Sequence, residues 1–157
     1  MLMAKILRLH ILPSDGKVLR AQNLDVSFPL TPEVKKLIAD MKTTVKKAPG
    51  IGLAAPQVGV NIKLAVIYLE EFGLKGFTII NPVVVSRSIK KSIMQEGCLS
   101  IPGVFGPVKR PAKVEVFAQT EEGTKILIQG DGLLGKVLQH EIDHLNGVLI
   151  ADKIIKK

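Results

Sequence analysis

The sequence predicts an α+β domain with a mainly antiparallel β-sheet packed around a central helix, preceded by an N-terminal helix. One helical pattern comes early in the chain, several strand-like segments follow it, and a second helical pattern comes near the end. This order differs from the repeating β-α-β pattern of a parallel sheet. The 157 residues suffice for one hydrophobic core, so we expect a single domain over residues 1–157, with a short segment after the second helix.

The first helix is expected within residues 31–50, which read TPEVKKLIADMKTTVKKAPG. Thr31 can cap its N-terminus, and Pro32 suits the first turn because that position needs no backbone N–H donor. Gly50 follows a lysine-rich last turn, as expected where a helix ends. The apolar residues recur at helical spacing and define one face, made of Val34, Leu37, Ile38, Met41 and Val45.

Strands are expected where β-branched and aromatic residues cluster between turn-forming residues. The last two of these segments flank Glu122 and Gly123, which predicts a hairpin. A second helix is expected over residues 131–147, DGLLGKVLQHEIDHLNG, closed by Gly147. Its composition leaves almost no polar face, so we expect this helix to be buried. The strand segments are KLAVIYLE (63–70), GFTIINPVVVSR (76–87), KVEVFAQT (113–120) and KILIQ (125–129).

Composition and charge disfavour several classes of protein. Apolar residues make up 46% of the chain and charged residues 23%, which is typical of a globular protein and not of a disordered one. No apolar run is long enough to span a bilayer and the N-terminus lacks a secretory signal pattern, so we expect a cytoplasmic protein with no membrane partner. The net charge of +8 suits acidic partners, but scattered lysine pairs and 4% aromatic residues do not indicate sequence-specific nucleic acid binding.

The second predicted helix carries two of the three histidines of the chain, in QHEIDH. His140 and His144 are four residues apart, so they share one helix face and can bind one metal ion. Glu141 begins beside that face and can exchange a proton with a water whose pKa the metal lowers, which is the chemistry of an HExxH helix. The alternative is a surface helix with two unrelated histidines, but this helix is apolar and buried histidines need partners. Asp143 either orients a histidine or meets solvent.

A catalytic metal site needs a third protein ligand and an open position. No histidine or glutamate follows His144, where a zinc peptidase would need one, and Asp152 is the sole carboxylate in that segment. His10 lies in an apolar N-terminal stretch, where a satisfied core or surface histidine is expected. Cys98, the single cysteine, stands in QEGCLSIPG and is either a buried apolar residue or a thiolate ligand. A thiolate with two imidazoles suits a divalent transition-metal ion.

Three segments together resemble the signature motifs of the peptide deformylase family. They read GIGLAAPQVG at residues 50–59, EGCLS at 96–100 and QHEIDHLNG at 139–147, in the family's order and at similar spacing. The resemblance extends over nearly the whole chain. It implies a metal-dependent amide hydrolase that removes the formyl group from the N-terminal methionine of nascent polypeptides and releases formate. It also implies one ferrous ion (Fe²⁺) per chain, which Zn²⁺, Ni²⁺ or Co²⁺ can replace.

The resemblance also implies a role for residues in each motif. The side-chain amide of Gln57 and the backbone N–H of Leu99 match donors to the oxyanion, where fixed donors favour hydrolysis. Glu96 and Arg110 match an ion pair that braces the cysteine loop. The implied metal ligands are Cys98, His140 and His144, and the implied general acid/base is Glu141. The implied substrate-binding residues are Gly50, Ile51, Gly52, Gly97 and Leu133.

Two positions depart from the family pattern, and rival functions stay open beside it. Phe105 lies near a position where members often have an arginine, and Lys136 falls where many have an apolar residue at the pocket mouth. The implied partners are N-formylmethionyl peptides and, transiently, the ribosome surface. The rivals are a zinc peptidase that cuts internal peptide bonds, a non-enzymatic basic protein that binds nucleic acid, and a catalytically inactive relative. The last is disfavoured because every expected catalytic residue is present.

Overall fold

The computed structural model describes residues 3–156 and contains a five-stranded sheet and a two-stranded sheet. None of the helices in this range is long and apolar enough to cross a bilayer. The strands are β1 (Gly52–Ala54), β2 (Leu64–Leu69), β3 (Leu74–Arg87), β4 (Lys91–Cys98), β5 (Ile101–Pro111), β6 (Lys113–Gln119) and β7 (Lys125–Asp131). The helices are α1 (Gly16–Leu19), α2 (Pro32–Lys47) and α3 (Gly132–Leu145), with short 3₁₀ turns η1 (Ala55–Val58), η2 (Glu70–Phe72) and η3 (Ile150–Asp152).

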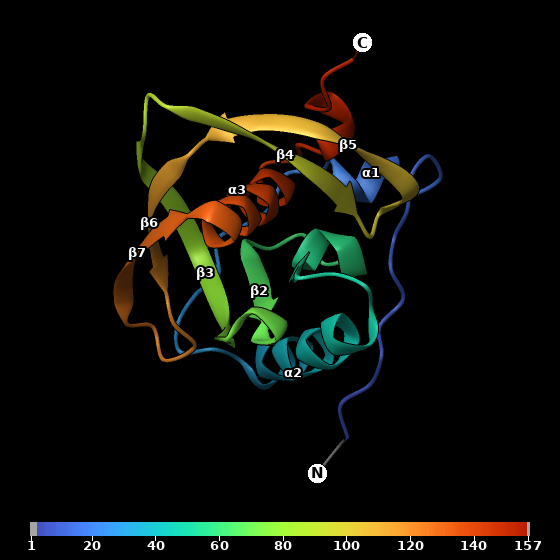
Figure 1. Cartoon of the computed structure of the whole chain (residues 1–157). Helices are drawn as coiled ribbons and strands as arrows, with labels where there is room; N and C mark the ends of the chain where they lie inside the picture. The colour runs from blue at the N-terminus through green and yellow to red at the C-terminus, as the bar shows by residue number, and fades with distance from the viewer. Residues whose placement is uncertain (1–2, 157) are drawn as a thin grey trace.

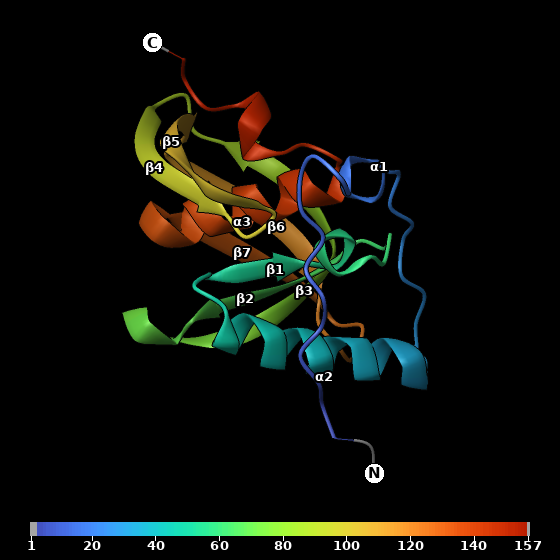
Figure 2. The same ribbon diagram turned by 90° about the vertical axis from the view of Figure 1, so that its right-hand side faces the viewer.

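The larger sheet is antiparallel throughout and has the strand order β1-β2-β3-β6-β7, while β4 pairs with β5 alone (Figure 1). Figure 2 shows α2 on one side of β1, β2 and β3, α3 on the other side, and the β4–β5 pair beyond α3. The α+β fold class predicted from the sequence is therefore confirmed, with α3 enclosed between the two sheets.

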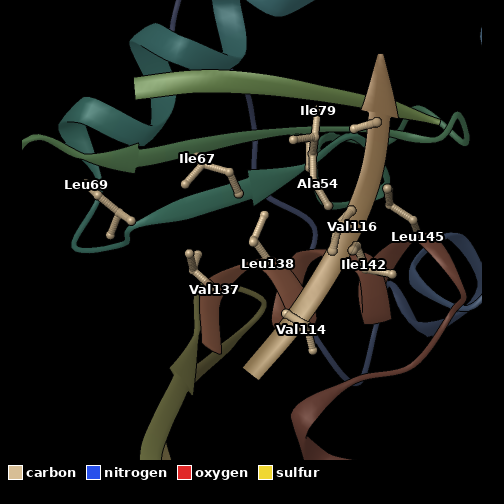
Figure 3. Close-up of a cluster of buried hydrophobic side chains, with 12 residues drawn as sticks. Ala54, Ile67, Leu69, Ile79, Val114, Val116, Val137, Leu138, Ile142 and Leu145 are labelled. Carbon is tan, nitrogen blue, oxygen red and sulfur yellow. The ribbon is translucent and has the colours of Figure 1, made fainter. Parts of the chain in front are cut away.

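The two faces of the larger sheet bury separate hydrophobic clusters. Alternate residues of β2 serve one cluster each, because side chains of a strand point to opposite faces in turn: Ile67 packs with α3, and Val66 packs with α2. Figure 3 shows the cluster on the α3 side. Its α3 members are Val137, Leu138, Ile142 and Leu145.

The predicted start and apolar face of α2 are confirmed. The Thr31 hydroxyl accepts a hydrogen bond from the Val34 N–H at 3.3 Å, which satisfies one of the free donors of the first turn. Of the predicted face, Ile38, Met41 and Val45 are buried against the sheet.

The predicted end of α2 at Gly50 is wrong. The helix ends at Lys47, and Ala48 is already extended, with φ −98° and ψ 155°. Ala48 precedes Pro49, and a following proline ring disfavours helical backbone at the residue before it. The chain therefore leaves the helix before the glycine and enters β1 as an extended segment.

The predicted end of α3 is confirmed at its glycine. Gly147 has a left-handed φ of +73°, and its N–H donates to the His144 carbonyl at 3.1 Å. A left-handed residue just past the last turn is a common helix ending, and glycine adopts it without steric cost.

The predicted hairpin around Gly123 is also confirmed, since β6 and β7 pair from Lys113 opposite Asp131 to Gln119 opposite Lys125. Strands β4 and β5 are not among the predicted segments. They run from Lys91 to Pro111 and contain the glycines and prolines that sequence patterns assign to loops. This β4–β5 pair carries the EGCLS motif and so forms one wall of the region described next.

The N-terminal segment crosses α2 before it reaches η1 (Figure 2). The Lys5 N–H donates to the Asp40 carboxylate at 2.8 Å, and the Leu7 N–H donates to the Thr44 hydroxyl at 2.9 Å. Asp40 and Thr44 are both buried on α2. The segment is thus held to the domain by main-chain hydrogen bonds.

Candidate metal centre

The side chains of Cys98, His140 and His144 converge where the end of β4 meets α3. Their ligand atoms all lie within 4.8 Å of one another. The Cys98 Sγ lies 3.3 Å from the His144 Nε2, and the two histidine Nε2 atoms are 3.2 Å apart. The structure therefore brings together the three residues that the sequence analysis selected as ligands.

Helix and strand geometry explain this convergence. His140 and His144 are one turn apart on α3, so their rings stand side by side on one face, with centroids 4.9 Å apart. Cys98 is the last residue of β4, at a shift in the pairing: Gly97 lies opposite Phe105, but Cys98 lies opposite Ile101. The chain thus turns back directly after the cysteine and leaves its sulfur against the helix.

The donor set suits a divalent transition-metal ion. A thiolate and two imidazoles are ligands that such ions prefer. His144 is buried, and its Nε2 is pointed at another imidazole nitrogen and at a sulfur. Two neutral imidazoles cannot form a hydrogen bond when the nitrogens that face each other are both acceptors. A cation between them can bind both nitrogens.

A buried ion-pair network contacts the Nδ1 side of the His140 ring, away from the Nε2 that faces the cluster. The His140 Nδ1 lies 3.1 Å from the Glu96 Oε1, and Arg110 binds both oxygens of Glu96, at 2.7 and 2.9 Å. The same guanidinium donates to Asp143 at 2.8 Å, and Lys153 lies 2.9 Å from that carboxylate. Burial alone would raise the pKa of Glu96, but the bonds from His140 and Arg110 lower it to about 2. Glu96 therefore stays anionic and fixes which ring nitrogen of His140 faces Cys98.

Glu141 lies beside the cluster with one free oxygen. Its side chain is buried, and its Oε2 has no hydrogen-bond partner within residues 3–156. Burial raises the pKa of this carboxyl to about 7. A Cβ added at Gly52 would lie 2.6 Å from the Glu141 Oε1, so β1 passes directly against the carboxylate.

Gln57 approaches the cluster from η1. Its Oε1 accepts a hydrogen bond from the Ala54 N–H at 2.9 Å, and its Nε2 donates to the Ser100 hydroxyl at 3.2 Å. The same Nε2 lies 3.7 Å from the Cys98 Sγ. A donor amide therefore stands next to the candidate ligand sulfur.

Gln57, Cys98, His140 and Glu141 line a cavity of about 580 Å³. Gly50, Ile51, Gly52 and Gly97, which the sequence analysis selected as substrate-binding residues, contribute to its walls. Leu133 does not: it packs at the edge of the α3-side cluster, and Val137, one turn later on α3, lines the cavity instead.

The two positions that depart from the family pattern form the cavity rim. Phe105 is 76% exposed, and its ring lies over Gly97, where an added Cβ would come within 2.4 Å of it. The Lys136 ammonium donates to the Gln95 carbonyl at 3.1 Å. An exposed aromatic ring and a cation therefore border the entrance.

Comparisons with known proteins agree with this geometry. The family model described as polypeptide deformylase matches residues 8–157. The chain belongs to the polypeptide deformylase family. It is 44% identical over 147 residues to the peptide deformylase of Desulfitobacterium hafniense. The alignment covers 94% of this chain and 95% of that one. Members of this family are metal-dependent hydrolases that remove the formyl group from nascent polypeptides, and this is the activity of the chain.

Solved peptide deformylases have the same fold. The enzyme from Thermotoga maritima matches with a TM-score of 0.86 at 33% identity, over 96% of this chain and 99% of that one. A peptide deformylase from Synechococcus elongatus in complex with actinonin matches with a TM-score of 0.88 at 42% identity, over 100% of this chain and 85% of that one. The shared fold covers both the β4–β5 pair and α3, and therefore the whole candidate site.

Several contacts of this deformylase were not predicted from its sequence. Asp143 binds Arg110 and Lys153, and the Ser100 hydroxyl accepts a hydrogen bond from Gln57. No spacing pattern signals such contacts, because they join segments that only the fold brings together. His10 lies apart from the cluster, with its Nδ1 3.4 Å from an Asp15 oxygen, as expected of a histidine outside the site.

Proposed function

We propose that Cys98, His140 and His144 hold one ferrous ion and that the chain uses it to deformylate N-formylmethionyl peptides. The observation that supports this most is the convergence of the three donors beside the buried Oε2 of Glu141, for which the described residues provide no hydrogen-bond partner. Zinc, nickel or cobalt can take the place of iron in the same donor set. When bound, such an ion polarises the formyl carbonyl and lowers the pKa of a coordinated water.

Glu141 is the proposed general acid/base. Its free Oε2 takes a proton from the water that attacks the formyl carbon, and it returns the proton to the amine nitrogen as the C–N bond breaks. The products are formate and a free N-terminal methionine. Because Gly52 leaves no Cβ in this space, the carboxylate can stay where the water is activated.

Gln57 and Leu99 are the proposed oxyanion donors. Negative charge develops on the formyl oxygen in the tetrahedral state, and fixed N–H groups aimed at it lower the barrier. Gln57 and Leu99 both line the cavity. The Gln57 Nε2 lies 3.7 Å from the Cys98 Sγ, and Leu99 directly follows Cys98. Glu96 and Arg110 take no part in the bond changes and hold His140 in place.

The proposed substrate-binding residues surround the methionine of the peptide. Gly50, Gly52 and Gly97 allow close main-chain approach, and Ile51 is an apolar wall. Leu133 remains in this set as a prediction, one turn from the cavity residue Val137 on α3.

The proposed setting is the cytoplasm, where formylated chains emerge from ribosomes, with residues 1–157 as one catalytic domain. A basic protein of net charge +8 can meet the ribosome surface transiently through its phosphates. Co-sedimentation with ribosomes that falls as salt is raised would support this contact, and its absence at low salt would contradict it.

The proposed function is tested by formate release from formyl-Met-Ala-Ser with Glu141→Ala and Glu141→Gln. Both changes are expected to lower kcat by about 10²–10⁴-fold, because general acid–base catalysis contributes that much. Metal content should stay at the wild-type level, since Glu141 is no ligand. Glu71→Gln, at an exposed carboxylate in η2, is the matched control and should leave kcat unchanged.

Two results would contradict the proposal. Undiminished turnover in both Glu141 variants would exclude the proton transfer assigned to this residue. Cleavage of internally quenched peptides by the wild type, at a rate comparable to deformylation, would favour the zinc peptidase alternative instead.

A further inference from the structure

The carboxamide of Gln57 is held at both of its polar ends. The Ala54 N–H can only donate, so the atom 2.9 Å from it must be the amide oxygen of Gln57. This contact settles which end of the carboxamide is the oxygen, so the atom that faces Ser100 is the nitrogen. The Ser100 hydroxyl accepts one N–H of Gln57 at 3.2 Å.

The second N–H of Gln57 is the one that faces the candidate metal centre. An amide nitrogen carries two hydrogens, and the nitrogen of Gln57 is 3.7 Å from the Cys98 Sγ in addition to its bond with Ser100. One of these hydrogens is bonded to the Ser100 hydroxyl, so the other points toward the region of the Cys98 sulfur. The terminal torsion of a glutamine side chain is broad and soft, so a partner at each end decides where this hydrogen points.

The N-terminal segment joins the same two residues through the main chain. The His10 N–H donates to the Gln57 carbonyl at 2.8 Å, and the Leu12 N–H donates to the Ser100 carbonyl at 2.9 Å. Ser100 is 0% exposed and Gln57 is 2% exposed. The N-terminal segment therefore binds the main chains of both Gln57 and Ser100. This fixes the positions of the two residues whose side chains share the hydrogen bond.

We propose that Ser100 is a positioning residue for the deformylation reaction, whose hydroxyl orients the Gln57 carboxamide toward the oxyanion. This inference rests on the oxyanion role proposed for Gln57. Ser100 touches no reacting atom, and it acts through Gln57 alone. The consequence is that Ser100 contributes to kcat only while Gln57 is present.

A double-mutant cycle in kcat tests this dependence. In the wild-type background, Ser100→Ala is expected to lower kcat about 3- to 10-fold, the worth of one hydrogen bond, with KM changed less than about twofold. Gln57→Ala is expected to lower kcat about 10²–10³-fold. In the Gln57→Ala background, Ser100→Ala should cost less than about twofold further, because its partner is absent.

The outcomes separate the inference from the function on which it rests. An equal loss from Ser100→Ala in both backgrounds, or no loss in either, overturns the positioning role of Ser100. An unchanged kcat in Gln57→Ala overturns the oxyanion role of Gln57 itself.

A spectroscopic readout in the zinc-loaded protein tests the same contact without turnover. Zinc is diamagnetic, so the side-chain NH₂ signals of Gln57 can be assigned from their loss in Gln57→Ala. In Ser100→Ala the two hydrogens should shift and exchange faster with solvent, because one has lost its acceptor. Unchanged Gln57 signals in Ser100→Ala would contradict the proposal.

One further variant separates the role of the Ser100 hydroxyl in orienting Gln57 from the role of Ser100 in packing, and a second variant is a control. Ser100→Thr keeps the hydroxyl and should retain the wild-type kcat of its folded fraction even if the added buried methyl group lowers the melting temperature. A threonine variant as slow as the alanine variant would contradict the role of the hydroxyl. Ser88→Ala is the control: it removes a serine hydroxyl outside the cavity that accepts a hydrogen bond from the Lys113 N–H, and it should leave kcat and the Gln57 signals unchanged.

Discussion

A single glycine, Gly52, leaves the space that the catalytic carboxylate of Glu141 occupies. At Gly52 the main chain of β1 runs against the Glu141 carboxylate, and a Cβ would come within 2.6 Å of its Oε1. Glu141 is buried on α3, so its carboxylate has little room to retreat. The smallest residue is therefore required at this position by packing alone, independently of any contact that the Gly52 backbone makes with substrate.

Gly52→Ala is expected to lower kcat by about tenfold or more while metal content stays at the wild-type level. The added methyl group must displace the Glu141 carboxylate, and misplacement of a catalytic group by about 1 Å can cost about 10²-fold. Gly16→Ala is the matched control, since its Cβ would meet only Leu12 at an ordinary 3.5 Å. Formate release by the two variants checks this, and an unimpaired Gly52→Ala enzyme would show that the carboxylate has more freedom than its burial indicates.

At the scale of elements, Arg110 joins three of them. It stands on β5, binds both oxygens of Glu96 on β4, and reaches Asp143 on α3. Glu96 in turn contacts the ligand His140. This buried guanidinium therefore helps to set the orientation of α3 relative to the cysteine loop.

Arg110→Met is expected to lower the free energy of unfolding by about 3–5 kcal/mol, because it leaves the Glu96 carboxylate buried without its cation. It should also weaken zinc affinity by about 10–100-fold, since the support of His140 is loosened. Lys109→Met, at the exposed neighbouring position, is the control and should change neither. Urea unfolding and zinc titration measure both effects, and an Arg110→Met protein as stable as the wild type would refute this account of the network.

The elements differ in how well the sequence predicts them. The apolar face and cap of α2 were predictable because helical spacing and capping are local properties. Strands β4 and β5 were not, since β5 contains Pro102, Pro107 and Pro111. Proline has no N–H to donate to a β-ladder and is confined to edge strands, strand ends and bulges, so the sequence pattern counts against a strand here. Pairing across the β4–β5 turn, and not local propensity, makes these residues strands.

At the scale of the whole molecule, the fold encloses α3 from both sides. The five-stranded sheet packs against its apolar residues, and the β4–β5 pair lies beyond its other side (Figure 2). This enclosure explains why His144 and Glu141 are 1% and 2% exposed although they are polar. A buried imidazole such as that of His144 needs a partner, and a bound cation would supply one.

The candidate site was predictable where chemistry restricts the sequence. Two histidines four apart with a glutamate between them, and one cysteine in the chain, leave few ligand sets to consider. The supports of that site were not predictable. Which residue holds Gln57, and where Asp143 points, depend on how β4, η1 and α3 meet in three dimensions.

The central claim is that Cys98, His140 and His144 close around one ion. The most direct test is the metal content per chain, measured by elemental analysis of anaerobically purified wild type and of the Cys98→Ala, His140→Ala and His144→Ala variants. The wild type is expected to hold about one divalent ion, with iron the principal metal, and each variant much less, because a catalytic site needs three protein ligands. Full metal content in any one of the three variants would contradict the assignment of that residue as a ligand.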